Sequence, residues 1–454
     1  MTLKIGNAQG FWGDDPDAPA RLVSQQSDLD YVTMDYLAEV SLSIMAAQRE
    51  RKPELGYPRD CVEAIRSLAP FWRTGRRIRV VTNGGGLNPR GCAEACAAAL
   101  RKDGCKGLRI GIVSGDDILE RMRRLIREGS SVDLMRNLET GEGIDRISER
   151  LVTANAYLGV DGIVRALESG ADIVLTGRVT DSSLVCAPCV HHYGWKTTEY
   201  DKLAGGLVAA HVIECGIQVS GGISTDWLEV PSPADMGFPF VEVEQDGTFV
   251  VTKPDGTGGC VTEQTVKEQL LYEIGDPERY LTPEATVSFR DIEVRQEGTD
   301  RVRLWGFRGS APPSTYKVSA SYRDGFWAQG TLTIFGRDAL EKAERCGRIV
   351  QERVRRAGYD LEGFEVESLG SGACAPGVLP ATELLETVLR IAVRDSREEA
   401  VERFCRELTP LVTSGPQGLT GFSAGRPRPS PVFGYWPCLI PRDMVSVDVE
   451  ILEV

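Results

Sequence analysis

The sequence predicts an α/β protein, with a parallel-sheet α/β domain over residues 1–282 and an α+β domain over residues 283–454. Two observations support this class. In the first half of the chain, short apolar runs rich in β-branched residues alternate with segments of helical periodicity, as in proteins whose parallel strands are joined by right-handed crossovers. After about Pro283 strand-like and helix-like segments follow one another irregularly, which is typical of α+β domains.

Five strands are expected in the N-terminal domain, joined by helices. The expected strands cover residues 4–5, 29–34, 79–82, 109–113 and 173–176. The expected helices cover residues 16–26, 36–49, 59–71, 91–102, 118–128, 162–169, 182–192 and 203–213. A hairpin over residues 240–252, turning at Asp246-Gly247, and a helix over residues 262–274 follow.

The C-terminal domain is expected to mix strands and helices without regular alternation. Its expected strands cover residues 287–294, 301–307, 326–335, 364–369, 432–436 and 445–451. Its expected helices cover residues 337–357, 382–393 and 398–408.

Charge and hydrophobicity indicate the kind of partner and the compartment to expect. The net charge of −14 argues against a nucleic-acid partner. No apolar run approaches the roughly 20 residues of a membrane helix, and the N-terminus leads directly into a strand, so a cytoplasmic protein is expected. A homo-oligomer is also expected.

The cysteines and histidines do not form a metal or redox motif. The twelve cysteines are scattered, and the pair Cys186 and Cys189 has no second pair to face it. Most are expected to be buried thiols. With three histidines, a histidine-rich metal centre is not expected.

Polar side chains follow most of the expected parallel strands. Because the carboxyl ends of such strands meet at one edge of a sheet, where ligands bind, these side chains should share that edge. They are Asn7, Asp35, Asn83, Asn88, Asp116 and Arg178. Each could instead be a turn residue or a helix N-cap, since Asn and Asp favour both. The loops match neither a dinucleotide fingerprint nor a P-loop.

The stretch from Ala171 to Ser183 carries the strongest signal. Its strand ends at Gly177, and Arg178 and Asp181 follow where a helix should begin. The guanidinium of Arg178 offers a fork suited to a carboxylate or phosphate. The alternative is that Arg178 and Asp181 pair with each other or cap the helix.

Two further segments are candidates for the site. Glu214, at the end of an expected helix, is a general base if it is desolvated, or a helix-terminal residue facing water. Lys253, Gly256, Gly258 and Gly259 precede a helix and could bind an anion or polar ligand with backbone N–H groups. The alternative is a flexible connection with Thr262 as N-cap.

Six stretches together resemble the acyclic terpene utilisation family, the AtuA-like proteins, over nearly the whole chain. The stretches are Asp30–Glu39, Thr82–Pro89, Ala154–Gly159, Thr176–Leu184, Gly256–Gly259 and Phe433–Pro437. The resemblance implies metabolism of organic acids or acyl thioesters. It also implies a small ferredoxin-fold domain or partner protein; we expect no such domain up to Val454, and a separate ferredoxin-fold partner protein is possible. It implies no list of catalytic residues.

Three functions remain open. The first is a lyase, of the hydratase or dehydratase type, in which Arg178 anchors the acid or acyl-CoA and Asn83 and Asn88 orient it. Its proton carriers would be Asp35, Asp181 or Glu214, and it needs no redox cofactor. The second is a non-catalytic metabolite-binding subunit of a complex. The third is a hydrolase using Mg²⁺ or Ca²⁺ on rim carboxylates such as Asp14, Asp35 and Asp116.

Overall fold

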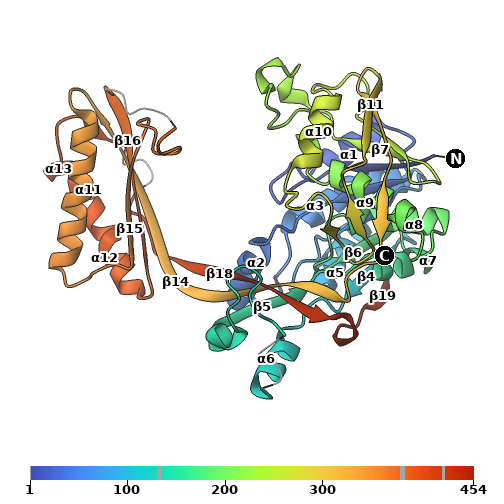
Figure 1. Cartoon of the computed structure of the whole chain (residues 1–454), viewed down its shortest axis with the longest axis horizontal. Coiled ribbons are helices and arrows are strands. Elements are labelled where there is room, and N and C mark those ends of the chain that lie inside the picture. The colour runs from blue at the N-terminus through green and yellow to red at the C-terminus, as the bar shows by residue number, and fades with distance from the viewer. Residues whose placement is uncertain (1, 130–133, 379–383, 422–424) are drawn as a thin grey trace. The chain divides into compact units, whose positions relative to one another are not determined.

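The computed structural model of the chain describes residues 2–129, 134–378, 384–421 and 425–454. The chain forms two compact units (Figure 1), of which unit 1 contains residues 1–321 and 435–454 and unit 2 contains residues 322–434. Strands β14 (Thr315–Phe335) and β18 (Ser430–Pro441) pair with each other and carry the chain across the two unit boundaries.

Unit 1 is built on a ten-stranded sheet whose centre is parallel. The parallel strands, in spatial order, are β1 (Leu3–Asn7), β2 (Tyr31–Met34), β3 (Arg79–Thr82), β6 (Ile173–Thr176) and β4 (Arg109–Ser114). All four residues of β6 are buried, which explains its continuous apolar sequence. The α/β class predicted from the alternation of strands and helices is confirmed.

Antiparallel strands extend the sheet on both sides. On the β1 side lie β7 (Phe240–Val243), β8 (Phe249–Thr252), β12 (Arg301–Trp305) and β11 (Glu293–Gly298). On the β4 side lies β19 (Asp448–Glu453). The compact units therefore differ from the boundary expected at residue 283, because backbone pairing joins residues 293–305 and 448–453 to the N-terminal sheet.

Helices cover both faces of the sheet. Those of unit 1 are α1 (Ala18–Gln25), α2 (Ser41–Arg51), α3 (Arg59–Ser67), α4 (Ala69–Arg73), α5 (Pro89–Lys102), α6 (Leu119–Arg127), α7 (Val160–Glu168), α8 (Ser183–Tyr193), α9 (Tyr200–Ile213) and α10 (Glu263–Leu271). Apolar side chains of α1, α3 and α5 join Ile173 and Leu175 of β6 in one buried cluster. Helices α7, α8 and α9 contact the sheet without contributing to that cluster, so they cover its other face.

Shorter elements complete unit 1. They are β5 (Leu151–Ala156), which pairs with β14, the small antiparallel sheet of β13 (Arg308–Ser310), β10 (Thr286–Ser288) and β9 (Tyr280–Leu281), and the 3-10 turns η1 (Ile144–Arg150), η2 (Gly216–Gln218), η3 (Trp227–Glu229), η4 (Pro233–Asp235) and η6 (Arg442–Met444).

Unit 2 is an antiparallel sheet with helices. Its strands are β15 (Gly363–Leu369), β16 (Glu386–Asp395), β17 (Leu419–Thr420) and the second half of β14, and its helices are α11 (Ala339–Arg356), α12 (Glu398–Leu408) and α13 (Leu411–Ser414). Side chains of α11 and α12 pack with those of β14 and β16 in one apolar cluster.

The helix expected over residues 382–393 is wrong for the part that the structure describes. Residues from Glu386 onward form β16, and residues 382–383 lie outside the described residues. Leu389, Ile391 and Val393 are buried in alternation with more exposed residues, so the segment has a period of two. The β-branched residues in it favour a strand between β14 and β15.

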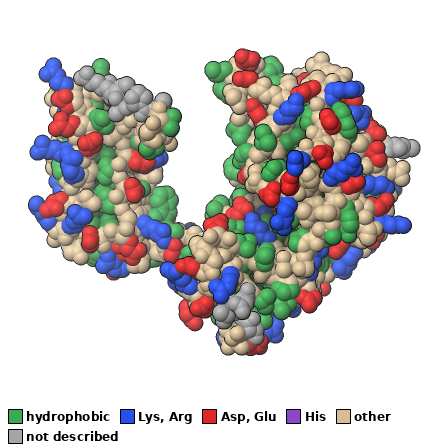
Figure 2. Space-filling view, viewed as in Figure 1, with side chains coloured by type: hydrophobic (Ala, Val, Ile, Leu, Met, Phe, Trp, Pro, Cys, Tyr) green, Lys and Arg blue, Asp and Glu red, His purple; other side chains and the backbone are tan. Residues whose placement is uncertain are grey.

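Positive and negative side chains are interspersed on the visible face of the chain (Figure 2). Among the residues that the structure describes, no helix is long and apolar enough to cross a membrane.

The end of β4 provides a test of the packing of β19 on the parallel sheet. Gly115 has a φ of +108°, and a Cβ added to it would lie 1.9 Å from the carbonyl oxygen of Ser446. We predict that Gly115→Ala lowers the free energy of unfolding by about 1–3 kcal/mol, through overpacking and backbone strain. Thermal or denaturant melts check this, with Gly275→Ala as control because no atom lies within 4 Å of its added Cβ. Equal stability of the two variants would contradict the prediction.

Candidate functional site

The carboxyl ends of the five parallel strands bring distant residues together. Asn7 is the last residue of β1. Asp35 directly follows β2 and Asn83 directly follows β3, and Arg178 lies two residues beyond β6. Asp116 lies two residues beyond β4. At this edge, which the sequence predicted, hydrogen bonds link Asn83 to Asp35 and the main chain of Arg178 to Asp116.

Arg178 is the most deeply buried charge at this edge, with 2% of its surface exposed. Its Nη1 and Nη2 atoms lie 3.0 and 3.3 Å from the two carboxylate oxygens of Asp181, and Nη1 also donates to the carbonyl oxygen of Leu37. Its guanidinium carbon lies 4.2 Å from the ring centre of Tyr157. The pairing with Asp181, which was the alternative interpretation of the sequence, is therefore present.

The charge state of Arg178 follows from these neighbours. Burial alone would lower the pKa of a guanidinium, but the carboxylates of Asp181 and Asp35 raise the pKa of Arg178 above its ordinary value. One donor, the Nε–H, is buried and has no hydrogen-bond partner among the residues that the structure describes. Both terminal nitrogens thus contact protein oxygens, and the Nε–H remains for another oxygen.

Asp35 is held by Asn83. The Asn83 Nδ2 donates to Oδ1 of Asp35 at 2.6 Å, and its Oδ1 accepts from the backbone N–H of Tyr36 at 2.8 Å. The same Asp35 oxygen accepts from the backbone N–H of Leu37 at 3.1 Å. Burial raises the pKa of Asp35 to about 6, although Arg178 and Asn83 favour its ionised form.

These bonds also explain a difference in helix α2. A helix was expected from residue 36, but it begins at Ser41. Side-chain oxygens of Asn83, Asp35 and Ser41 accept from the N–H groups of residues 36–38. The segment is therefore held in a non-helical form in which the Leu37 carbonyl reaches Arg178.

Asp116 supports the main chain at Arg178. Its Oδ2 accepts from the backbone N–H of Arg178 at 2.8 Å and from Nδ2 of Asn155 at 2.7 Å. Gly177 permits this approach, because an added Cβ would lie 2.3 Å from the Asp116 carboxylate. Burial raises the pKa of Asp116 to about 6.

Glu214 reaches the edge from the end of α9. The amide of Asn7 donates to the carbonyl oxygens of Ile213 and Glu214 at 2.7 and 2.9 Å. The Glu214 Oε1 lies 2.9 Å from Nδ1 of His211, while its Oε2 is buried without a hydrogen-bond partner. The sequence drew attention to neither His211 nor its contact with Glu214, since the residues are one helical turn apart on an apolar helix.

Asp181 is the accessible member of this group. Its side chain keeps 34% of its surface exposed, against 13% for Glu214 and 2% for Arg178. The surrounding protein still desolvates its carboxylate and raises the pKa of Asp181 well above its ordinary value; Arg178 opposes this rise, and Asp35 and Glu214 add to it. We call Asp35, Arg178, Asp181 and Glu214 the edge cluster.

Tyr157 connects the edge cluster to β5. It lies beneath the Arg178 guanidinium, and its hydroxyl donates to Glu39 at 3.4 Å. The stretch Ala154–Gly159 that carried the family resemblance contains this residue, but its sequence alone did not indicate a contact with Arg178.

Asn88 has a capping role in the structure. Its side chain accepts from the N–H of Gly91 at 3.0 Å as the N-cap of α5, and its Nδ2 donates to the carbonyl oxygens of Glu54 and Leu55. Both ends of the amide are therefore occupied by the protein.

The glycine-rich turn before α10 also uses its donors internally. The N–H groups of Gly258 and Gly259 donate to the carbonyl oxygens of Asp235 and Pro231, both at 2.7 Å. Lys253 is buried, donates to the Thr257 carbonyl at 2.9 Å and lies 3.1 Å from Asp300. Gly256 adopts a φ of +74°, and Thr262 caps α10 as the alternative interpretation held. The anion cradle expected at Gly258 and Gly259 thus lacks free N–H groups.

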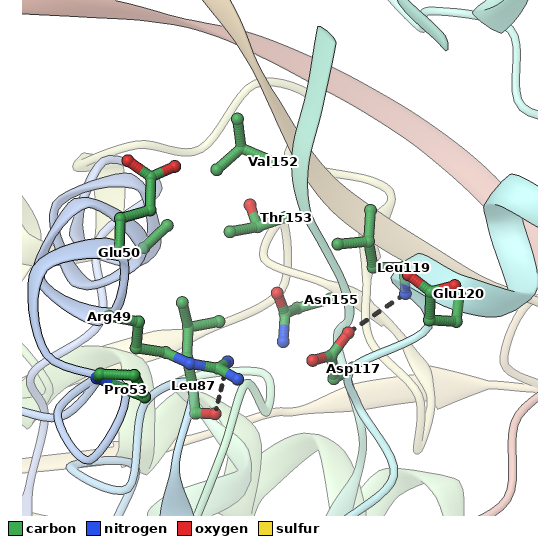
Figure 3. Close-up of a pocket in the computed structure, with 11 residues that line it drawn as sticks. Arg49, Glu50, Pro53, Leu87, Asp117, Leu119, Glu120, Val152, Thr153 and Asn155 are labelled. Carbon is green, nitrogen blue, oxygen red and sulfur yellow. Dashed lines mark hydrogen bonds between the residues drawn. The ribbon is translucent and has the colours of Figure 1, made fainter. Parts of the chain in front are cut away.

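A cleft of about 420 Å³ opens beside β5 and α2 (Figure 3). Arg49 and Glu50 border it from α2, Asp117 borders it from the loop after β4, and Asn155 borders it from β5. Asn155 lines the cleft and its Nδ2 donates to Asp116, but the four residues of the edge cluster do not line the cleft.

The carboxylates named as metal ligands each have protein partners. Asp14 accepts from the N–H of Gly10 at 2.7 Å, and Asp35 and Asp116 bind the amides of Asn83 and Asn155. Within the described ranges, no three His, Cys, Asp or Glu side chains gather as a metal site would require.

Comparison with known proteins identifies one family. The model described as "Acyclic terpene utilisation family protein AtuA" matches residues 3–451. No curated protein and no solved structure matches the chain.

Asp116 gives a prediction about pH and stability. Its pKa is about 6 in the folded chain and about 3.9 in an unfolded chain, so the folded state binds more protons between these values. Stability should therefore fall as the pH rises from about 4 to about 6, by on the order of 2 kcal/mol for this group. Asp116→Asn, which keeps the acceptor oxygen, should make this fall less steep in thermal melts. The exposed Asp255→Asn is the control, and an unchanged slope in Asp116→Asn would refute the prediction.

Arg178 gives a second prediction. Arg178→Lys should lower the free energy of unfolding by about 1.5–3 kcal/mol, because a single ammonium nitrogen cannot occupy the positions of both Nη1 and Nη2, which contact Asp181 and the Leu37 carbonyl. Denaturant melts measure this loss. Arg90→Lys, an exposed arginine with two surface ion pairs, should change stability little. Equal effects in both variants would show that the buried contacts of Arg178 do not stabilise the fold.

Proposed function

Because the chain belongs to the acyclic terpene utilisation family AtuA, we propose that it is an enzyme of organic-acid or acyl-CoA catabolism, a lyase of the hydratase or dehydratase type. The observation that supports this proposal is the edge cluster. It places two carboxyl groups with raised pKa, Asp35 and Asp181, around one buried guanidinium. Carboxyl groups whose environments hold their pKa values apart are suited to act as an acid and a base in one reaction.

The roles follow from pKa and access. With a pKa of about 6, Asp35 is mainly ionised near neutral pH and can accept a proton. Burial raises the pKa of Asp181 well above its ordinary value, which favours uptake of a proton and makes Asp181 the candidate proton donor, and its exposed surface lets a substrate approach. Glu214, held by His211, is the alternative base.

The reaction balances without an oxidant or reductant. In the dehydration direction the base takes the proton from the carbon next to the carbonyl, and a carbon–carbon double bond forms as the carbon–oxygen bond to the hydroxyl breaks. Asp181 gives its proton to that hydroxyl, which leaves as water. Arg178 would stabilise the charge that develops on the carbonyl oxygen with its unpartnered Nε–H.

A thermal-shift screen with organic acids and acyl-CoA thioesters would identify the substrate class, since a ligand that binds only the folded state raises its stability. Turnover of each stabilising compound is then measured as gain or loss of the double bond by absorbance. Ligand binding without turnover by the pure chain would favour the other proposal, a metabolite-binding subunit that needs a small ferredoxin-fold partner. Turnover only after addition of Mg²⁺ or Ca²⁺ would favour the metal-assisted hydrolase.

We predict that Asp181→Asn lowers kcat by about 10²–10⁴-fold, the usual contribution of a general acid. Asparagine keeps the shape and the hydrogen-bond acceptor for Arg178, so the variant should still fold. Asp35→Asn should lower kcat in the same range, and the exposed Asp255→Asn should not. Full activity of both cluster variants, with melting temperatures like that of the wild type, would exclude the carboxyl mechanism.

A further inference from the structure

A second cavity in unit 1 lies away from the edge cluster and shares no lining residue with it. It has a volume of about 660 Å³, within the range of small-molecule sites. Its walls come from α7, the end of α8, the start of β14 and the turn η6. Its lining is mixed. Val160, Val164, Trp195 and Leu203 are apolar, and Asp161, Arg165, Glu168 and His191 are charged or polar.

Glu284 is a largely buried carboxyl group in the wall of this cavity. The residue is 8% exposed, and its Oε1 accepts from the backbone N–H of Val160 at 2.7 Å. Gly159 allows this contact, because an added Cβ would lie 2.2 Å from the same oxygen. The other oxygen, Oε2, is buried and has no hydrogen-bond partner among the residues that the structure describes. A buried carboxylate oxygen without a donor is costly, so a ligand that supplies a donor would be favoured.

Arg442 supplies a donor in the same cavity. Its Nη2 donates to the carbonyl oxygen of Pro283 at 2.5 Å, and its guanidinium carbon lies 4.9 Å from the ring centre of Tyr316. Among the residues that the structure describes, none forms a hydrogen bond with its Nε, which is buried. Both residues line the cavity, and each carries one buried polar atom without a partner, an acceptor on Glu284 and a donor on Arg442.

We propose that this cavity binds an apolar molecule through a carboxamide group. The amide N–H would donate to Oε2 of Glu284, and the amide carbonyl would accept from Nε of Arg442. A carboxylate ligand is disfavoured when Glu284 is ionised, because it would place a second negative group against a buried carboxylate. Burial raises the pKa of Glu284 to about 7, so the group is mainly ionised at about pH 8.

The experiment compares octanamide and octanoate as probes of the full chain at about pH 8, by calorimetry or ligand-observed NMR. Octanamide should bind at least about tenfold more tightly than octanoate, as expected when one hydrogen bond to a charged group is lost. Glu284→Gln replaces an acceptor by a donor and keeps the bond to Val160, so it should reverse this preference. Glu168→Gln, which changes an exposed carboxylate on the same cavity wall, should leave the preference unchanged.

Val164→Trp provides a test that does not alter Glu284. It should fill the cavity and weaken octanamide binding by at least tenfold with little change in melting temperature, since Val164 is only half-buried. Equal affinity of the wild type for both probes would overturn the proposal. So would an absence of octanamide binding at millimolar concentration, or an unchanged preference in Glu284→Gln.

Discussion

The geometry of the edge cluster depends on one buried ion pair, that between Arg178 and Asp181. A charge with 2% of its surface exposed is costly unless its donors are satisfied and an opposite charge lies beside it. Asp181 supplies the opposite charge and, with the Leu37 carbonyl, lies beside Nη1 and Nη2, while the Tyr157 ring covers the guanidinium. The segment after β2 and the segment after β5 are thereby joined to the end of β6.

The charges of the edge cluster do not balance if every carboxyl group is ionised. Glu214 lies close enough to raise the pKa of both Asp35 and Asp181, and Arg178 is the positive charge of the cluster. The raised pKa of Asp35 and Asp181 is the physical consequence, because burial and mutual repulsion both favour the protonated form. Carboxyl groups with a raised pKa beside accessible surface are suited to acid–base catalysis.

Other polar residues at the same edge serve the fold. Asn88 binds backbone groups at both ends of its amide, and Asn83 and Asp116 each accept from one backbone N–H and bind one neighbouring side chain. The glycine turn at Gly258 and Gly259 binds main-chain carbonyls in the same way. Buried backbone groups must find partners, and at the ends of strands the nearby Asn and Asp side chains provide them. The edge thus combines residues that hold the loops in place with the edge cluster, whose side chains are the candidates for acid–base chemistry.

The sequence alone determined the α/β class, the five parallel strands and the edge at which Asp35, Asn83, Asp116 and Arg178 meet. These follow from local periodicity and from the rule that parallel strands end together. It did not determine the strand order, the addition of residues 293–305 and 448–453 to the sheet, or the strand at Glu386–Asp395, because these depend on backbone pairing with distant segments. Nor could it decide that Arg178 pairs with Asp181, that Asn88 caps α5, or that His211 holds Glu214. Each of those depends on which partner lies within hydrogen-bond distance once the chain is packed, and only the tertiary structure brings those partners together.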